Sequence, residues 1–303
     1  MHRVRLLATM ALVAPTVVAT IGVAAQPSSP TTVLTPASSA APSSPVIVNG
    51  TRYRPTRRVP PPPLVHGRAW AIADLRTGVM LGVHRPRVGL APGSTIKLLT
   101  ALTAVRRVAR LPRHRATQRE SSMICSCAGI IAARRYPRAD LLAGTLVPSG
   151  NDAAETLAGS DPVGRRAFIN AMNRRTDALG LFGTHAGNPS GLDHPVGYST
   201  ARDLVVLLRA AYRHDLVRPY LDLRRTRIGP LGGPTHVVVH RTPYVHTYAD
   251  SVAAKSGTTR RAGKVLVAIT RYAGRLISVA LMGSPDDGVT GDVRALTVWA
   301  ARH

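Results

Sequence analysis

The chain has 303 residues, a hydrophobic content of 45% and a formal net charge of +25, so it can bury a full core and presents a strongly basic surface. Such a surface attracts anions, among them acidic polymers, anionic lipids and acidic substrates, although a coding bias toward arginine would give the same charge without a partner. Nucleic acid is excluded as a partner, because the arginines are scattered, only 4% of residues are aromatic, and no recognition-helix or base-stacking motif is found.

The N-terminus has the pattern of an export signal. Arg3 and Arg5 precede an apolar run from Leu6 to Ala25, which ends in small residues where a signal peptidase would cleave. We therefore predict a signal peptide over residues 1–25 and a location outside the cytoplasm, in the cell wall or periplasmic space. Because the run is about 20 residues long, an uncleaved membrane anchor is the alternative.

Residues 26–63 are rich in Pro, Ser, Thr and Ala and nearly free of apolar periodicity. Such a stretch cannot bury enough surface to offset its chain entropy, so we predict a disordered linker. Residues 64–303 form the predicted folded domain. The chain stops at His303, soon after the last predicted helix, so we expect any membrane attachment to come from the N-terminus. In that compartment the anionic partners would be cell-wall polymers or lipids.

Strand patterns stand at both ends of this domain and helical patterns in its middle. Residues 69–84 predict two strands around a turn at residues 76–78, and Ala273-Gly274 predicts a hairpin between two later strands. A long helix is predicted from Ser94, and the last of four further helices has Ser199 or Thr200 as its N-cap. Those four helical patterns cover residues 140–147, 152–158, 164–179 and 200–214, the later strands are "THVVVH", "SVAAKSG", "KVLVAITRY" and "RLISVALMGS", and the closing helix is "DVRALTVWAARH". This order predicts an α/β (α+β) fold, an antiparallel sheet flanked by helices with a mostly helical second lobe.

Neither the cysteines nor the paired histidines predict a metal site. Cys125 and Cys127 are too few ligands for zinc, and a disulfide across one residue is strained, although an oxidising compartment would allow it. A structural or incidental role is favoured over a catalytic one, because no histidine motif accompanies them. His236 and His240 flank three valines, which favours a strand, where residues four apart are separated by about 13 Å and cannot share one ion.

Lysine is rare in this chain. Of 40 basic residues only Lys97, Lys255 and Lys264 are lysines. Lys97 follows Ser94 by three residues, so on a helix both side chains lie on one face. A neutral lysine amine can take the proton of a serine hydroxyl, whereas an arginine guanidinium stays protonated. The alternative is an ordinary N-terminal serine with a solvent-reaching lysine.

Two further stretches carry polar groups suited to a peptide substrate. "VPSGNDAAETLA" places a hydroxyl, a glycine and an amide at a turn before a helix: Ser149, Gly150 and Asn151. "AAKSGTTR" places Lys255 on a strand followed by a hydroxyl, a glycine and a second hydroxyl, which are Ser256, Gly257 and Thr258. The glycine would let a substrate backbone approach the strand, and the lysine and hydroxyls would receive a carboxylate.

Together these three motifs, in this order, resemble the penicillin-recognising serine enzymes. Within them, "GSTIKLLTALTAV", "SGNDAAETLA", "NPSGLDHPVGYSTARDLVVLL" and "AKSGTT" are similar to the serine-type D-Ala-D-Ala carboxypeptidases, the low-molecular-mass penicillin-binding proteins. The similarity covers Ala69 to Ser284. It implies a β-lactamase/transpeptidase-like fold, hydrolysis of the terminal D-Ala from peptidoglycan stem peptides, covalent inhibition by β-lactams, and no cofactor or metal.

The resemblance also implies which residues are catalytic. Ser94 would be the nucleophile, acylated by the penultimate D-Ala of a stem peptide, and Lys97 would be its general base. Ser149 would relay a proton to the leaving D-Ala. The backbone N–H groups of Ser94 and Thr258 would form the oxyanion hole, and water would hydrolyse the acyl-enzyme.

The remaining motif residues would bind substrate. The resemblance implies that Asn151 binds the substrate amide and that Lys255, Ser256 and Thr258 bind the terminal carboxylate. Lys255 would also keep Lys97 deprotonated, and Gly257 would allow close approach. Ser256 stands where the family more often has threonine, so we expect modest effects on substrate or β-lactam preference.

Three alternatives share these residues or the fold. A class A β-lactamase would need a Glu-x-x-Leu-Asn arrangement after the second motif, and neither Glu120 nor Glu155 stands in that pattern, so penicillin should acylate Ser94 and leave slowly. Endopeptidase or transpeptidase action on cross-bridges uses the same residues and stays open. A non-catalytic wall-binding protein would have lost a motif member, and none is lost.

Overall fold

The computed structural model describes residues 46–48, 51–53 and 60–303. The chain divides into two units, residues 1–58 and 59–303. In the first unit β1 (Val46–Val48) pairs antiparallel with β2 (Thr51–Tyr53). The predicted signal peptide and the rest of the predicted linker up to residue 59 lie outside the described residues, so both stay predictions. Among the residues that are described, no helix has the length and apolar character needed to cross a membrane.

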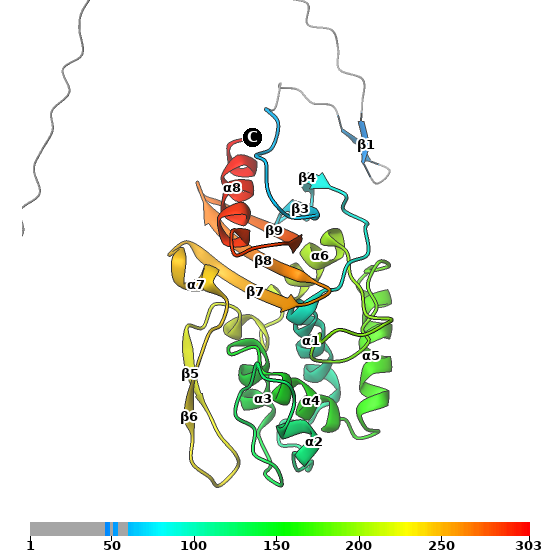
Figure 1. Ribbon diagram of the computed structural model, residues 1–303, viewed down its shortest axis with the longest axis vertical. Helices are drawn as coiled ribbons and strands as arrows, with labels where there is room; N and C mark the ends of the chain where they lie inside the picture. The colour runs from blue at the N-terminus through cyan, green and yellow to red at the C-terminus, as the bar shows by residue number, and fades with distance from the viewer. Residues whose placement is uncertain (1–45, 49–50, 54–59) are drawn as a thin grey trace, which may run out of the picture. The chain divides into compact units, whose positions relative to one another are not determined.

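A five-stranded antiparallel sheet organises the second unit (Figure 1). Its order is β4-β3-β9-β8-β7, so the first hairpin of the domain lies beside the last. The strands are β3 (Ala69–Asp74), β4 (Met80–His84), β7 (Ser251–Thr259), β8 (Gly263–Tyr272) and β9 (Arg275–Ser284). The predicted turn between β8 and β9 is confirmed, with Ala273 and Gly274 at φ 48° and 76°. Strand β7 is left as an edge.

Helices cover both faces of the sheet. One face packs against α8 (Val289–Arg302) and α7 (Pro243–Thr247) through a core that includes Trp70, Tyr244 and Leu296. The other face packs against α6 (Ala201–Tyr212), which begins where the Thr200 hydroxyl accepts the N–H of Asp203. The closing helix and the Thr200 cap are thus confirmed.

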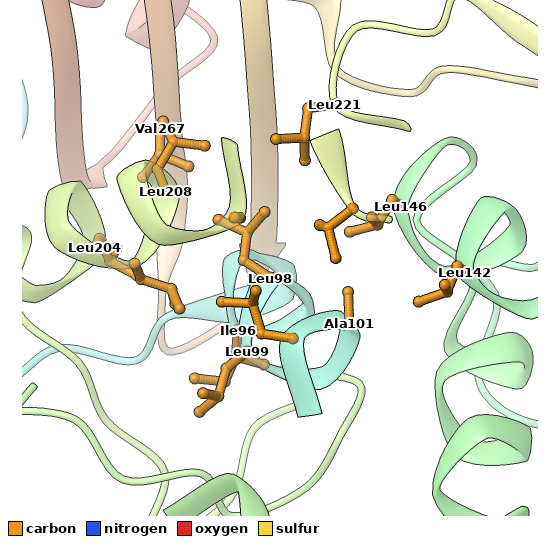
Figure 2. Close-up of a cluster of buried hydrophobic side chains, with 14 of the residues drawn as sticks. Ile96, Leu98, Leu99, Ala101, Leu142, Leu146, Leu204, Leu208, Leu221 and Val267 are labelled. Atoms are coloured by element: carbon orange, nitrogen blue, oxygen red, sulfur yellow. The ribbon is translucent and has the colours of Figure 1, made fainter. Parts of the chain in front are cut away.

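A helical lobe extends from this second face. It contains α1 (Lys97–Arg107), α2 (Gln118–Ser121), α3 (Arg138–Leu146), α4 (Asn151–Gly159) and α5 (Arg165–Ala178). Leucines of α1 link the lobe to the sheet: Figure 2 shows Leu98 and Leu99 among side chains of α3, α6 and β8. The predicted fold class, an antiparallel sheet flanked by helices with a helical second lobe, is therefore confirmed.

Several short elements were not predicted. Two of them, β1 and β2, lie within the predicted disordered linker. Besides α2 and α7, the others are the 3-10 turns η1 (Gly93–Ile96) and η2 (Arg218–Tyr220) and the strand β5 (Arg225–Ile228), which pairs with β6 (His236–Val239). The prediction that the long helix starts at Ser94 was wrong by one turn, because Ser94 lies in η1 and α1 begins at Lys97.

Candidate active site

Ser94 and Lys97 meet at the junction of the sheet and the helical lobe. The tight turn η1 runs directly into α1, and it places Lys97 Nζ 2.8 Å from Ser94 Oγ. Ser94 is half-buried and Lys97 is fully buried. The spacing of three residues therefore brings the two reactive groups into hydrogen-bond contact, as the sequence predicted.

Two acceptors also contact the Lys97 amine. Nζ lies 2.7 Å from Asn151 Oδ1 and 2.6 Å from the Ser190 carbonyl oxygen. Burial lowers the pKa of Lys97 well below its ordinary value of 10.5, and the positive charge of Lys255 lowers it further. Ser190 was not among the predicted site residues, because it acts through a backbone carbonyl that any residue type supplies.

The start of α4 fixes the orientation of Asn151. Its backbone N–H donates to the Ser126 carbonyl at 2.7 Å, and its side-chain Nδ2 donates to the Ile124 carbonyl at 2.6 Å. Because a carbonyl only accepts, Nδ2 must face Ile124 and Oδ1 must face Lys97. The loop that supplies both carbonyls contains the disulfide between Cys125 and Cys127.

The second lysine contacts the second motif. Lys255 Nζ donates to Ser149 Oγ at 2.8 Å and to the Ser256 carbonyl at 2.9 Å. Lys255 is 1% exposed, and burial lowers its pKa to about 7. Ser149 has φ 63°, a left-handed conformation that is costly for a residue with a Cβ and is typical of functional sites.

The edge of β7 that is not paired with β8 runs close to Ser94. On this edge the N–H of Ala254 donates to Leu221 O and that of Ser256 to Thr242 Oγ1, so by alternation the N–H of Thr258 faces the same way. A Cβ on Gly257 would lie 2.5 Å from Ser94 N, which shows how closely the strand approaches η1. The N–H groups of Ser94 and Thr258 therefore lie at one junction.

The Ser256 hydroxyl contacts Thr242 at the edge of β7. Successive side chains alternate across a strand, so Ser256 and Lys255 lie on opposite faces of β7, on either side of this edge. Its Oγ lies 3.1 Å from Thr242 Oγ1, and Thr242 is 1% exposed. Thr242 was missed by sequence reasoning, since no motif links the residue before α7 to a strand that starts nine residues later.

The two histidines predicted to lie apart do so. His236 Nε2 contacts the Ala128 carbonyl at 2.7 Å, whereas His240 is buried and its Nδ1 accepts the N–H of Thr242 at 3.1 Å. Burial and the nearby Lys255 charge lower the pKa of His240 to about 3. Both residues thus have structural contacts, and the strand prediction for this segment is confirmed by β6.

The contacts of Lys97 determine what the serine–lysine pair can do. A neutral amine has two protons and one lone pair. Since Asn151 Oδ1 and Ser190 O only accept, both protons point to them and the lone pair points to Ser94 Oγ. The amine is then oriented to take the Ser94 proton. This pair, between an antiparallel sheet and a helical lobe, defines a serine hydrolase of the penicillin-recognising class.

Comparisons with known proteins assign the family. The chain belongs to the D-alanyl-D-alanine carboxypeptidase family of serine peptidases, whose sequence profile matches residues 56–285. It is 34% identical over 217 residues to D-alanyl-D-alanine carboxypeptidase DacB2 of Mycobacterium tuberculosis, covering 71% of this chain and 74% of that protein. It is 31% identical over 229 residues to a D-alanyl-D-alanine endopeptidase of Escherichia coli, covering 73% and 72%.

The fold agrees with a solved structure of the same family. The crystal structure of a D-alanyl-D-alanine carboxypeptidase from Mycobacterium tuberculosis H37Rv superposes with a TM-score of 0.76 at 30% sequence identity. The alignment covers 81% of this chain and 95% of that chain. The family and the enzyme class predicted from the motifs are therefore confirmed.

Proposed function

We propose that this chain hydrolyses the terminal D-Ala from peptidoglycan stem pentapeptides through an acyl-enzyme on Ser94. The observation that carries the proposal is the Lys97 amine, buried and 2.8 Å from Ser94 Oγ, with its other two contacts made by acceptors. In the acylation step Ser94 Oγ attacks the carbonyl of the penultimate D-Ala while its proton passes to Lys97. The N–H groups of Ser94 and Thr258 stabilise the oxyanion.

The other motif residues act on the leaving group and the substrate. Ser149 protonates the leaving D-Ala amine and is reprotonated through Lys255, whose Nζ lies 2.8 Å from Ser149 Oγ. Asn151 binds the substrate amide. The terminal carboxylate is bound by Lys255, Ser256 and Thr258, and the positive charge of Lys255 helps to keep Lys97 neutral.

Penicillins acylate Ser94 in the same way, and the resulting acyl-enzyme hydrolyses slowly. A class A β-lactamase deacylates penicillin with a glutamate that activates water, and the chain has only two glutamates. Glu120 contacts His114 at 2.8 Å and caps α2, while Glu155 pairs with Arg165 at 2.5 Å. Both carboxylates are occupied by structural contacts, which favours a penicillin-binding peptidase over a β-lactamase.

The proposed domain organisation places this activity outside the cytoplasm. Residues 1–25 act as an export signal or an uncleaved anchor, residues 26–63 as a linker, and residues 64–303 as the catalytic domain. The proposed partners are peptidoglycan stem peptides and, through the net charge of +25, anionic cell-wall polymers or lipids.

The function is tested by measuring free D-Ala released from a pentapeptide ending in D-Ala-D-Ala, in parallel with cleavage of a cross-linked peptide dimer. We expect release from the pentapeptide and little cleavage of the dimer. The second candidate is a D,D-endopeptidase, favoured by the similarity to the Escherichia coli endopeptidase. Dimer cleavage without pentapeptide trimming would replace the first candidate by the second.

A further inference from the structure

Thr242 joins the edge of β7 at the residue proposed to bind carboxylate. The Thr242 side chain accepts the backbone N–H of Ser256 at 3.0 Å, and its Oγ1 also lies 3.1 Å from Ser256 Oγ. The residue is rigidly held, because its own N–H donates to His240 Nδ1 and Pro243 follows it at the start of α7. Thr242 is not part of any of the three sequence motifs.

The protons of these two hydroxyls can be assigned by elimination. Thr242 Oγ1 accepts from Ser256 N, so its own proton needs an acceptor, and a buried hydroxyl without one costs about 1 to 3 kcal/mol. Among the described residues, Ser256 Oγ is the one side-chain or backbone acceptor recorded for it. Thr242 therefore donates to Ser256 Oγ.

This assignment decides what the Ser256 hydroxyl can do. Its oxygen is occupied by the Thr242 proton, so its own proton is free to point elsewhere. Ser256 is half-buried while Thr242 is fully buried, so of the two residues Ser256 is the one that a substrate can reach. A carboxylate is an acceptor only and needs a donor there.

We propose that Thr242 is a positioning residue that makes Ser256 a hydrogen-bond donor and so sets the preference for substrates with a free terminal carboxylate. The proposal rests on the proposed function of Ser256. Thr242 makes no contact with substrate itself. It acts by supplying one proton to Ser256 Oγ and by holding Ser256 N at the strand edge.

A double-mutant cycle separates this role from a general effect on folding. Thr242→Val keeps the shape and removes both hydrogen bonds, and we expect it to lower the acylation rate by benzylpenicillin about tenfold or more. In a Ser256→Ala background the same change should cost at least about threefold less, because the hydroxyl it orients is gone and only the bond to Ser256 N is lost. Thr242→Ser should restore the wild-type rate.

A second substrate tests the carboxylate. Benzylpenicillin methyl ester has no free carboxylate, and Thr242→Val should lower its acylation rate at least about threefold less than that of benzylpenicillin. Thr247→Val is the matched control, because Thr247 is an exposed residue of α7 whose hydroxyl bonds only its own helix, at Pro243 O. Thr242→Ala replaces Thr242→Val if the latter melts below the assay temperature.

If Thr242→Val lowers the acylation rate equally with both penicillins, or equally in the wild-type and Ser256→Ala backgrounds, Thr242 has only a structural role and the proposal is overturned. An unchanged rate in Thr242→Val would overturn it as well. If the wild-type chain reacts with neither penicillin, the proposed function fails. If the wild type reacts and the cycle shows no coupling, only the role of Thr242 fails.

Discussion

Replacing Lys97 by arginine keeps a basic side chain of similar reach. It removes the lone pair that is needed to accept the Ser94 proton. The Lys97 amine is fully buried, and its pKa is lowered by burial and by Lys255, so a neutral form with a free lone pair is accessible. A guanidinium has a pKa above about 12 and no lone pair to accept the Ser94 proton. It can still donate to Asn151 Oδ1 and Ser190 O.

The expected loss follows from the role of the general base. Removing a positioned base costs about 10² to 10⁴ in rate, so acylation of Lys97→Arg by a fluorescent penicillin should fall about 10³-fold at pH 7. The rate should not recover at pH 9, because the guanidinium stays charged. The assay is the second-order rate of covalent labelling, with a thermal melt to show that the variant is folded.

Lys264→Arg is the matched control. Lys264 is the third lysine of the chain, lies on β8 and pairs with Asp287 at 2.7 Å, so arginine can replace it there. We expect this variant to label at the wild-type rate. Labelling of Lys97→Arg within about tenfold of wild type would refute the argument that proton transfer requires a lysine at this position.

Two further predictions concern β7. The pKa of Lys255 is about 7, so kcat/KM for a carboxylate-bearing substrate should fall as pH rises through this value, because the cation is lost. Lys255→Arg should remove this descending limb of the pH profile. A limb that persists in Lys255→Arg would belong to another group. Gly257→Ala places a Cβ 2.5 Å from Ser94 N, so the acylation rate should fall about 100-fold. The control is Gly291→Ala in α8, which has open space around it and should not change the rate. Similar rates for both variants would contradict the close approach of β7 and η1.

The sequence predicted the elements whose apolar pattern is long. Strands β8 and β9 and helices α1 and α6 are each ten residues or more, and each strand contains a run of six consecutive buried residues, as a strand covered on both faces does. Strand β5, "RTRI", has a single apolar residue and forms only because β6 pairs with it, so its own four residues carry almost no signal. The 3-10 turn at Ser94 is likewise set by tertiary contact, since Gly93 packs against Gly257.

The site residues likewise include some that the sequence predicted and some that it did not. The reactive groups Ser94 and Lys97 are close in sequence, and a spacing of three determines their contact. The partners of Lys97 come from distant positions, Asn151 and Ser190, and one of them is a carbonyl with no residue-type signature. Thr242 is of the same kind, because its importance depends on which strand edge α7 is packed against.

The rarity of lysine in this chain helped to identify the predictable part of the site. Two of the three lysines are almost fully buried at the site, and their pKa values are lowered there. Arginine, which carries most of the net charge of +25, could not be neutral at the position of Lys97. The bias toward arginine therefore makes the retained lysines informative.

The central claim is that Ser94 is the nucleophile of a penicillin-recognising peptidase. The most direct measurement incubates the purified chain with a fluorescent penicillin and locates the adduct by mass spectrometry of its peptides. We expect one adduct on the peptide containing Ser94 and none in a folded Ser94→Ala variant. Labelling that persists in Ser94→Ala, or an adduct on another residue, would contradict it.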